Sequence, residues 1–371
     1  MSMNLTEREQ QVVSLLRRDP MISSAAIAER LGTTRASVNV HLSNLGKKGV
    51  ILGRGYLLSE APGVVVVGGS NIDVKARSAA PVTRHTSNPG HGSMAPGGVG
   101  RNIAENLARL GTRTHLVTAL GRDALGDSLL AQTSAAGVHL EYVTRTDLPT
   151  GTYTALLDSD GELIVAVSDM AATGELGPDQ VDAARDLVAT AGLVVLDGNL
   201  APAALEHALE LACAAQVRAI LEPVSVPKAR ALASCITADR PLYAVTPNRD
   251  ELTALTGLAA RTDRQLSHAA ASLHQRGVEL VWVRLGERGS LLSSSTGEAT
   301  FIPAVPTTVV DVTGAGDSML AAFCHALLEG ADPVDAARYG HAAAALTIAS
   351  PHTVRPDLTA RLVHAALNQL D

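Results

Sequence analysis

The sequence predicts an α/β protein whose mostly parallel β-sheet is covered by helices on both faces, with a small winged helix-turn-helix in front of it. Beyond residue 63, short apolar runs typical of buried strands alternate with Ala-rich stretches of helical character. The first sixty residues instead hold three short amphipathic helical patterns and an apolar run interrupted by Gly-Arg-Gly. We therefore divide the chain into residues 1–60 and 61–371.

The N-terminal module begins with a capping box. Thr6 and Glu9 are spaced to cap each other's backbone N–H groups, and they open an amphipathic helix that ends near Pro20. A second helix is predicted over residues 24–31, ended by Gly32, and a third from residue 33 or 34 to about residue 48. Residues 50–58 are predicted to form a two-stranded hairpin, the wing of a winged helix-turn-helix.

Residues 1–60 are predicted to bind DNA through the third helix. The residues that would face the DNA are Thr34, Arg35, Ser37, Asn39 and His41, with Arg54 on the wing. Eight basic and five acidic residues give this segment a net charge of +3, whereas the rest of the chain carries −10. Because +3 is a weak basic footprint, packing against a protein remains the alternative.

In the second part, buried strands are predicted at 64–67, 114–120, 193–196, 217–221, 242–245 and 280–284. Helices are predicted between them at 102–110, 179–190, 202–214 and 264–277. Residues 83–94 and 152–167 alternate polar and apolar side chains instead, and the second segment has a turn at 158–161. These two segments predict a small antiparallel lid, made by residues near 75–95 and 150–168.

Composition and missing motifs exclude several classes of protein. With 46% hydrophobic and 18% charged residues, the 371-residue chain is not disordered. No apolar run approaches the ~20 residues that cross a bilayer, and the N-terminal residues lack the apolar core of a signal peptide. We expect a cytoplasmic protein with no membrane partner. The chain has no GxxxxGK[ST] segment, which excludes a P-loop enzyme, and no complete GxGxxG fingerprint.

The segment 311–317, DVTGAGD, has the pattern of an anion-binding helix start. Its small residues Gly314, Ala315 and Gly316 leave backbone N–H groups uncovered, and an apolar helical stretch follows directly. A carboxylate at Asp317 would repel a bound phosphate, but it suits a general base that takes a proton beside an anion hole. A helix N-cap is the alternative role for this aspartate.

Three more segments occur in a recognisable order with DVTGAGD: GSNID at 69–73, GGVGRN at 97–102 and TPNRDE at 246–251. Together they resemble the motifs of the ribokinase-like (PfkB) family of sugar and nucleoside kinases. The resemblance covers residues 64 to about 368 and implies that family's α/β fold with a lid over the substrate, which some members use to dimerise. Within the family, the segments 87–90, 96–108 and 168–170 most resemble those of pseudouridine kinases.

The resemblance implies a sugar site. Its residues would be Asn71, Asp73, Gly97, Gly98, Asn102 and Asn199. A carboxylate and an amide two residues apart can bind vicinal hydroxyls in paired hydrogen bonds, although an Asx turn at a strand end is the alternative. For the base we select Asn88, Ser168 and Asp169, with lid turn chemistry as the alternative role.

The resemblance also implies a site for ATP and magnesium. Asn248 and Glu251 would organise Mg²⁺ and phosphate through water, and the other nucleotide contacts would be Arg284, Gly286, Gly289, Thr313 and His341. Asp311 resembles a potassium ligand of related kinases. Arg284, His341 and Glu222 depart from the usual family residues, so Arg284 could instead be structural.

The function implied is ATP-dependent phosphorylation of pseudouridine at its 5′-hydroxyl by a homodimer. Two alternatives stay open. One is a kinase for another nucleoside or furanose sugar, and the other is a transcription regulator that senses a nucleoside. A base beside an anion hole favours an enzyme over a purely sensory protein, because ligand binding alone needs no general base.

Overall fold

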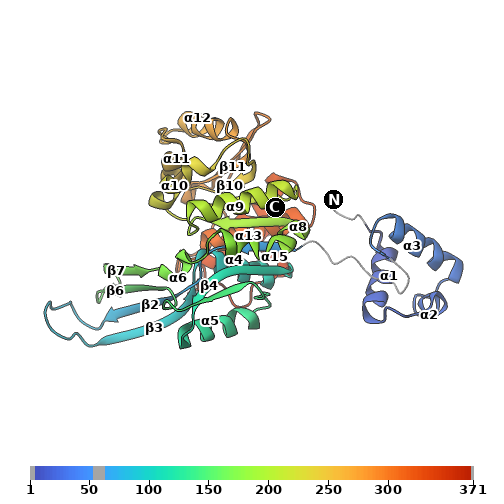
Figure 1. Cartoon of the computed structure of the whole chain (residues 1–371), viewed down its shortest axis with the longest axis horizontal. Coiled ribbons are helices and arrows are strands. Elements are labelled where there is room, and N and C mark those ends of the chain that lie inside the picture. The colour runs from blue at the N-terminus through green and yellow to red at the C-terminus, as the bar shows by residue number, and fades with distance from the viewer. Residues whose placement is uncertain (1–4, 53–62, 369–371) are drawn as a thin grey trace. The chain divides into compact units, whose positions relative to one another are not determined.

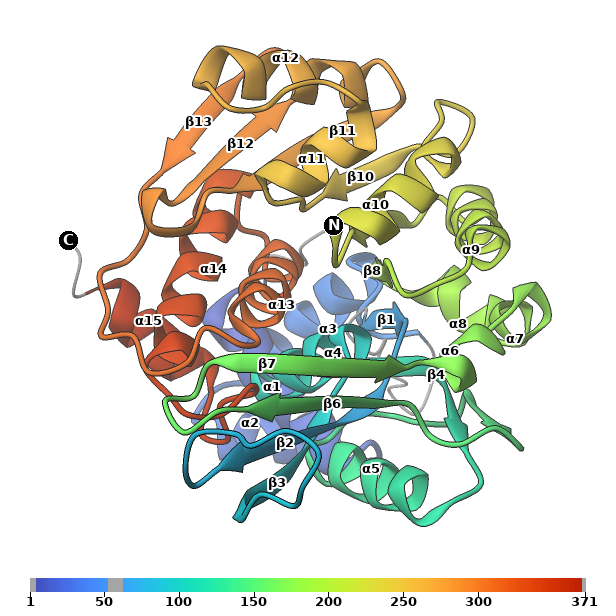
Figure 2. The same cartoon turned by 90° about the vertical axis from the view of Figure 1, so that its left-hand side faces the viewer.

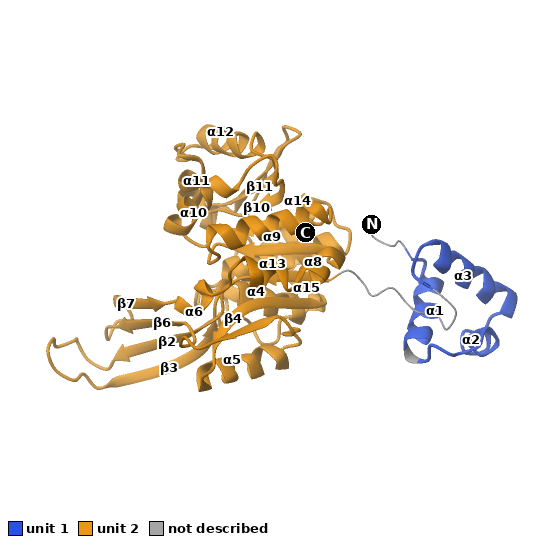
Figure 3. Cartoon of the chain, viewed as in Figure 1, with its two compact units in different colours: residues 1–61 blue, residues 62–371 orange. Residues whose placement is uncertain are grey.

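The computed structural model of the chain (Figure 1) describes residues 5–52 and 63–368. The chain divides into two compact units, Met1–Ala61 and Pro62–Asp371, which are coloured separately in Figure 3. None of the helices in the described ranges is long and apolar enough to cross a membrane.

The first unit is built from three helices, α1 (Glu7–Arg18), α2 (Ser24–Arg30) and α3 (Arg35–Lys47). The expected capping box is present, because Glu9 N–H donates to Thr6 Oγ1 at 3.3 Å and Thr6 N–H donates to Glu9 Oε2 at 2.8 Å. Glu9 also pairs with Lys48 at 2.7 Å, which ties α1 to the end of α3. The apolar sides of all three helices meet in one small core.

Helix α3 carries the residues predicted to face DNA. Thr34 caps it by accepting a hydrogen bond from Ser37 N–H at 3.2 Å, so its hydroxyl is used within the helix. Arg35 and Asn39 are exposed, and Ser37 and His41 are partly exposed. Most of the predicted wing, including Arg54, lies outside the described residues.

The second unit is organised around a nine-stranded sheet in the order β13-β12-β11-β10-β9-β8-β1-β4-β5. All neighbouring pairs are parallel except β11–β12 and β12–β13, which are antiparallel. The strand bounds are β1 (Val64–Val67), β4 (Thr114–Gly121), β5 (Val143–Thr146), β8 (Leu193–Asp197), β9 (Arg218–Glu222), β10 (Leu242–Val245), β11 (Val278–Arg284), β12 (Ser290–Ser294) and β13 (Ala299–Ile302). The mostly parallel sheet predicted from the sequence is confirmed.

Helices cover both faces of this sheet because its central strands are apolar on both sides. Val64 and Val66 belong to the core on one face, and Val65 and Val67 to the core on the other. The first face is covered by α4 (Val99–Arg109), α13 (Ala315–Leu328), α14 (Pro333–Ile348) and α15 (Ala360–Leu367). The second is covered by α7 (Pro178–Asp182), α8 (Arg185–Thr190), α9 (Pro202–Ala214), α10 (Val226–Leu232), α11 (Arg249–Thr256) and α12 (Asp263–His274).

The prediction of a single helix over 179–190 is wrong in one respect, because the structure divides this segment into α7 and α8. The chain leaves the α-helical path at Ala183 and Ala184, where Ala184 N–H turns to the Val181 carbonyl at 3.0 Å. Val181 and Val188 are both buried in the same core. Asp182, at the end of α7, also lies 2.9 Å from His207 of α9, and we attribute the break to this packing against α9, which overrides helix propensity.

The lid is a separate four-stranded sheet in the order β3-β2-β6-β7, whose strands lie side by side in Figure 2. It comprises β2 (Asn71–Ser78), β3 (Gly90–Gly97), β6 (Thr152–Leu157) and β7 (Leu163–Asp169), and the turn at 158–161 is where the sequence predicted it. The expectation of an antiparallel lid holds for β2–β3 and β6–β7 but is wrong for β2–β6, which is parallel. The long chain between β2 and β6 permits this pairing, since parallel strands need a crossover connection.

Candidate active site

The predicted motifs converge where the parallel strands end, as expected for ligand sites in α/β sheets. Residues 68–70 follow β1, Asn199 follows β8, and Asn248 follows β10. Asn71 lies directly opposite Gly97 in the β2–β3 ladder, so the first two sequence motifs are adjacent. A fourth strand-end group, Arg284, closes β11.

Asp317 lies in the first turn of α13, and Gly314 is the N-cap of that helix. Gly314 has φ +79°, and a Cβ there would come within 2.0 Å of the Thr353 carbonyl oxygen. Glycine is therefore required at this turn. The following residues, Ala315 and Gly316, begin the helix. Its first N–H groups have no acceptor within the helix, and they lie at the positive end of the helix dipole, where an anion is favoured.

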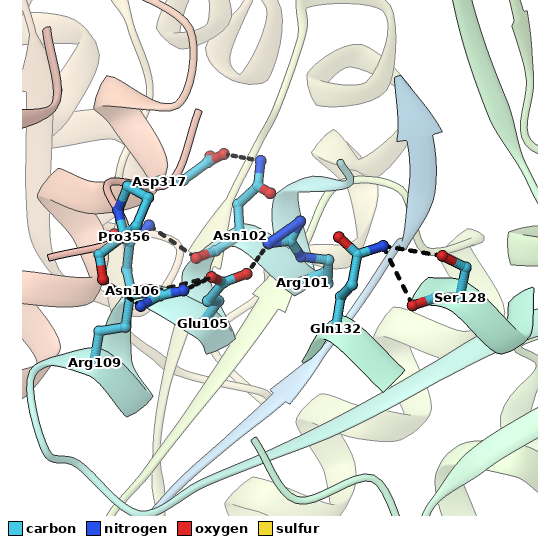
Figure 4. A network of polar contacts seen from close by, with 9 residues as sticks. All are labelled: Arg101, Asn102, Glu105, Asn106, Arg109, Ser128, Gln132, Asp317 and Pro356. Atoms are coloured by element: carbon cyan, nitrogen blue, oxygen red, sulfur yellow. Dashed lines mark hydrogen bonds and ion pairs between the residues drawn. The ribbon is translucent and has the colours of Figure 1, made fainter. Parts of the chain in front are cut away.

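The carboxylate of Asp317 is held by Asn102, a residue of α4 far away in sequence. Asn102 Nδ2 donates to Asp317 Oδ2 at 2.8 Å (Figure 4). Burial raises the pKa of Asp317 to about 7, although the Asn102 hydrogen bond and the Arg284 charge oppose the rise. The side chain nevertheless remains partly exposed. A carboxylate with a pKa near neutrality can accept and return a proton at physiological pH.

Asn71 and Asp73 form the expected amide–carboxylate pair. Asn71 Nδ2 donates to Asp73 Oδ1 at 2.8 Å, and burial raises the pKa of Asp73. Gly97 is needed beside them, because a Cβ there would lie 2.6 Å from the Asp73 carboxylate. Gly98 caps α4 at φ +96°. The four residues thus form a compact polar surface at the base of the lid.

Asp197, which the sequence reasoning missed, holds two of these loops together. Its side chain is fully buried, and its Oδ2 accepts hydrogen bonds from Gly69 N–H at 2.9 Å and Gly100 N–H at 2.7 Å. Its Oδ1 accepts from Asn199 N–H at 2.8 Å. The Asn199 side chain in turn accepts a hydrogen bond from Lys228. Asn199 is therefore next to the sugar motifs, but its side-chain oxygen already has a protein partner.

Two of the unusual residues, Arg284 and Glu222, are partners of each other. Arg284 Nη2 lies 2.6 Å from Glu222 Oε1 and 3.5 Å from Glu251 Oε2, and both carboxylates are buried. Burial alone would lower the pKa of Arg284, but the two carboxylates outweigh it and raise that pKa. A Cβ on Gly316 would lie 2.5 Å from Arg284 Nη1, so the guanidinium reaches the start of α13.

Asn248 and Glu251 cap the start of α11. Asn248 Oδ1 accepts from the N–H groups of Asp250 and Glu251, each at 2.9 Å, and Glu251 Oε2 accepts from Asn248 N–H at 2.8 Å. Burial raises the pKa of Glu251. Because these two oxygens already accept protein hydrogen bonds, the pair fits a magnesium ion held through water better than one bound directly.

A pocket of about 190 Å³ adjoins the start of α13. Its lining includes Ala315, Gly316, Arg284, Gly286, Gly289 and His341. His341 Nε2 lies 2.7 Å from Ser290 Oγ, which also accepts from Trp282 Nε1 at 2.8 Å. Burial lowers the pKa of His341 to about 4, so its ring is neutral at physiological pH. The structure thus brings four predicted nucleotide residues, Arg284, Gly286, Gly289 and His341, together with the helix start.

Asp311 and Thr313 lie in the loop before α13. Thr313 is exposed, and its N–H donates to Asp311 Oδ1 at 2.8 Å. Asp311 Oδ2 lies 3.6 Å from Lys75 Nζ of the lid. Burial alone would raise the pKa of Asp311, but the Thr313 hydrogen bonds and the Lys75 charge lower it.

The residues selected for base contact do not line this 190 Å³ pocket or the larger pocket described in the next paragraph. Asn88 is exposed, and its side chain closes a lid turn through bonds to the backbone of Thr83 and Thr86 at 2.8–3.2 Å. Its geometry fits the alternative of lid turn chemistry. Ser168 and Asp169 are exposed at the end of β7, where Asp169 pairs with Thr152, the partner of Ile72. They lie near the sugar motifs. Asp169 Oδ1, however, already accepts a hydrogen bond from Ala171 N–H at 3.2 Å, which is the turn chemistry named as its alternative role.

A larger pocket, of about 560 Å³, extends from Asp73 along α4. Lid strands β2 and β3, helices α4 and α5 (Ala124–Ala135), and the loop at 351–356 all contribute to its lining. Figure 4 shows three α4 side chains in this region, Arg101, Glu105 and Arg109, with Gln132 of α5 nearby. None of these four residues was selected from the sequence.

Comparison with known proteins shows the family of the chain. Residues 61–360 match the model of the pfkB family of carbohydrate kinases, and residues 5–51 match a winged helix-turn-helix DNA-binding model. The chain is 34% identical to an uncharacterised sugar kinase, YeiI, of Escherichia coli, over 96% of this chain and 97% of the relative. It is 33% identical to the pseudouridine kinase of E. coli, over 80% of this chain and 93% of the relative.

Among solved structures, that of Arabidopsis thaliana ribokinase with ribose and ATP superposes with a TM-score of 0.74. It is 29% identical in sequence, and the match covers 83% of this chain and 99% of that one. The fold, the order of the motifs and the family match agree. The chain belongs to the pfkB family of carbohydrate kinases and carries an N-terminal winged helix-turn-helix.

Proposed function

We propose that the chain transfers the γ-phosphoryl group of ATP to the 5′-hydroxyl of pseudouridine. The observation that carries the proposal is Asp317, a carboxyl with a pKa near 7 at the start of α13. Asn102 links it to the sugar motifs on one side, and the smaller pocket begins at Ala315 and Gly316 on the other. The choice of pseudouridine is supported by similarity to the E. coli pseudouridine kinase.

In this mechanism Asp317 accepts the proton of the 5′-hydroxyl while Asn102 fixes the orientation of its carboxylate. The backbone N–H groups of Gly314, Gly316 and Asp317 stabilise the charge that develops on the transferred phosphoryl group, whereas that of Ala315 donates to the Val312 carbonyl at 3.3 Å. Arg284 adds a fixed positive charge beside Gly316. Magnesium, held through water by Asn248 and Glu251, would neutralise triphosphate charge. Closure of the lid excludes water and so limits ATP hydrolysis.

The proposal is tested with a substrate panel. We expect the purified chain, with ATP and magnesium, to phosphorylate pseudouridine in preference to uridine, inosine, adenosine, ribose and fructose 6-phosphate. Turnover of ribose or another nucleoside instead would support kinase activity but reject pseudouridine as the substrate. Tight nucleoside binding without turnover of any member would favour a nucleoside-sensing regulator.

A DNA partner is proposed for residues 1–60 because their helices match a DNA-binding family and α3 exposes Arg35 and Asn39. The full chain should shift duplex DNA, with an affinity that falls as salt rises. Unchanged mobility of the DNA at low salt would reject this part of the proposal.

A homodimer is proposed through the lid. Strand β7 exposes Leu163, Ile164, Val165 and Val167, and β3 exposes Met94. Exposed apolar groups of this kind often mark protein contacts. We expect light scattering to give the dimer mass for the native chain, and the Val165→Lys variant to shift toward monomer. The exposed Val310→Lys variant, outside the lid, serves as the matched control. A monomeric native chain would overturn this proposal.

We propose Asp311 as the residue at which potassium would bind and activate the enzyme. In the structure, the positive charge beside the Asp311 carboxylate comes from the Lys75 ammonium, 3.6 Å away. Equal rates in potassium-free buffer would reject a role for potassium.

A further inference from the structure

Arg101 is a buried cation whose donors are only partly used. Its side chain is 2% exposed, and its Nη2 pairs with Glu105 one turn further along α4. Nε and Nη1 of the same guanidinium are buried and have no hydrogen-bond partner in the structure. Leaving charged donors unsatisfied in this way is costly, so a partner outside the chain is indicated.

The framework around Arg101 is complete without those two nitrogens. Glu105 also accepts hydrogen bonds from Arg109 Nε at 2.8 Å and Nη2 at 2.6 Å, and Arg109 donates to the Pro356 carbonyl (Figure 4). Glu105 would therefore keep a cationic partner if Arg101 were replaced. The free nitrogens of Arg101 are not needed to hold α4 in place.

Arg101 lines the 560 Å³ pocket together with Asp73. Asp73 belongs to the proposed sugar contacts, whereas the pocket continues beyond it to Ser93 and Gln132. A pocket of this size lies in the range that holds a whole small molecule and leaves room beside one furanose ring. The part of the substrate that occupies this space is therefore attached to the sugar near the hydroxyls that Asp73 binds.

The charges of the pocket favour a neutral occupant. Its charged lining residues are Asp73, Glu105, Lys75, Arg101 and Arg109, and Lys75 faces Asp311 at 3.6 Å. With Asp311 included, the acidic residues and the basic residues are equal in number, so the pocket does not require an additional anion. What the pocket lacks is an oxygen acceptor for the two Arg101 nitrogens. A carbonyl oxygen of an uncharged pyrimidine base supplies that acceptor.

We propose that this pocket is the base subsite of the enzyme and that Arg101 is a specificity-determining residue that donates a hydrogen bond to a pyrimidine carbonyl oxygen. The inference rests on the proposed nucleoside substrate. It assigns base recognition to the α4 face and not to Asn88 on the lid.

The test compares binding of pseudouridine and of free ribose by titration calorimetry with the full chain in the absence of ATP. Arg101→Met removes the donors and leaves Glu105 paired with Arg109. The dissociation constant for pseudouridine should rise about 10- to 100-fold, as expected for hydrogen bonds from a charged donor, while that for ribose stays unchanged. Arg101→Lys keeps a charge beside Glu105 but should lose affinity for pseudouridine in the same way.

The matched control is Arg145→Met. Arg145 also has a buried Nε without a partner and an ion pair, to Asp127 at 2.8 Å, but it does not line the pocket. Its replacement should change neither dissociation constant. Equal weakening of pseudouridine and ribose by Arg101→Met, or unchanged pseudouridine binding, would overturn the role of Arg101 alone. A native chain that binds ribose but not pseudouridine would overturn both this inference and the proposed substrate.

Discussion

Replacing Asp317 with Asn is expected to lower kcat by about 10² or more. The amide cannot accept the proton of the substrate hydroxyl, yet it has the same shape and can still contact Asn102. The measurement is steady-state phosphorylation by both proteins, with ATP binding as a check that the site remains formed. In the native chain, kcat/KM should fall tenfold per pH unit below about 7, where Asp317 becomes protonated. Near-normal turnover by Asp317→Asn would refute the assignment of the base.

The same substitution should stabilise the fold at alkaline pH. Because the folded-state pKa of Asp317 is raised, the folded protein binds this proton more tightly than the unfolded chain, and the associated stability is lost as pH rises to about 7. Asn does not titrate. The difference in free energy of unfolding between variant and native chain should therefore grow up to about pH 7 and stay constant above it. A difference that stays constant between about pH 4 and pH 7 would contradict the raised pKa.

Arg284→Met is expected to lower the free energy of unfolding by about 3–5 kcal/mol at pH 7, because a buried ionic group loses its partner. The buried carboxylates of Glu222 and Glu251 would then face each other without the cation that lies 2.6 and 3.5 Å from them. Urea unfolding monitored by circular dichroism measures the change. The loss should shrink at acidic pH, because burial raises the pKa of the Glu251 carboxyl, which then loses its charge by protonation.

A double variant separates this charge effect from lost packing. Arg284→Met combined with Glu222→Gln removes one carboxylate together with the cation, and it should recover much of the lost stability. A single Arg284→Met variant as stable as the native chain would show that the ion pair is not structural. If the double variant is no more stable than the single one, packing and not charge accounts for the loss.

Most of the fold could be predicted because apolar periodicity is strong in the central strands. β1 and β10 have the predicted bounds, since every residue of the first is buried and the second is a short apolar run between polar segments. The split of 179–190 into two helices and the parallel β2–β6 pair could not be predicted. Both depend on contacts between residues distant in sequence, which local propensity does not encode.

For the site, motifs identified residues whose chemistry depends on local sequence. Asp317 follows a glycine-rich turn, and Asn71 and Asp73 follow an apolar strand. Asp197 and Arg101 were missed because their roles depend on tertiary contacts. An aspartate that ends a buried strand was the available signal for Asp197. Arg101 gave no such signal, because its helix contains several other polar residues. The Glu222–Arg284 pair also joins two strand ends that are 62 positions apart.

The most direct test of the central claim is whether the purified full chain converts pseudouridine and ATP to pseudouridine 5′-phosphate and ADP, with the product identified by mass spectrometry and phosphorus NMR. We predict 5′-phosphorylation that requires magnesium, prefers pseudouridine to uridine and ribose, and is nearly abolished in Asp317→Asn. Absence of this product while ribose or another sugar is phosphorylated would contradict the proposed substrate. Absence of phosphoryl transfer to any of them would contradict the proposed function itself.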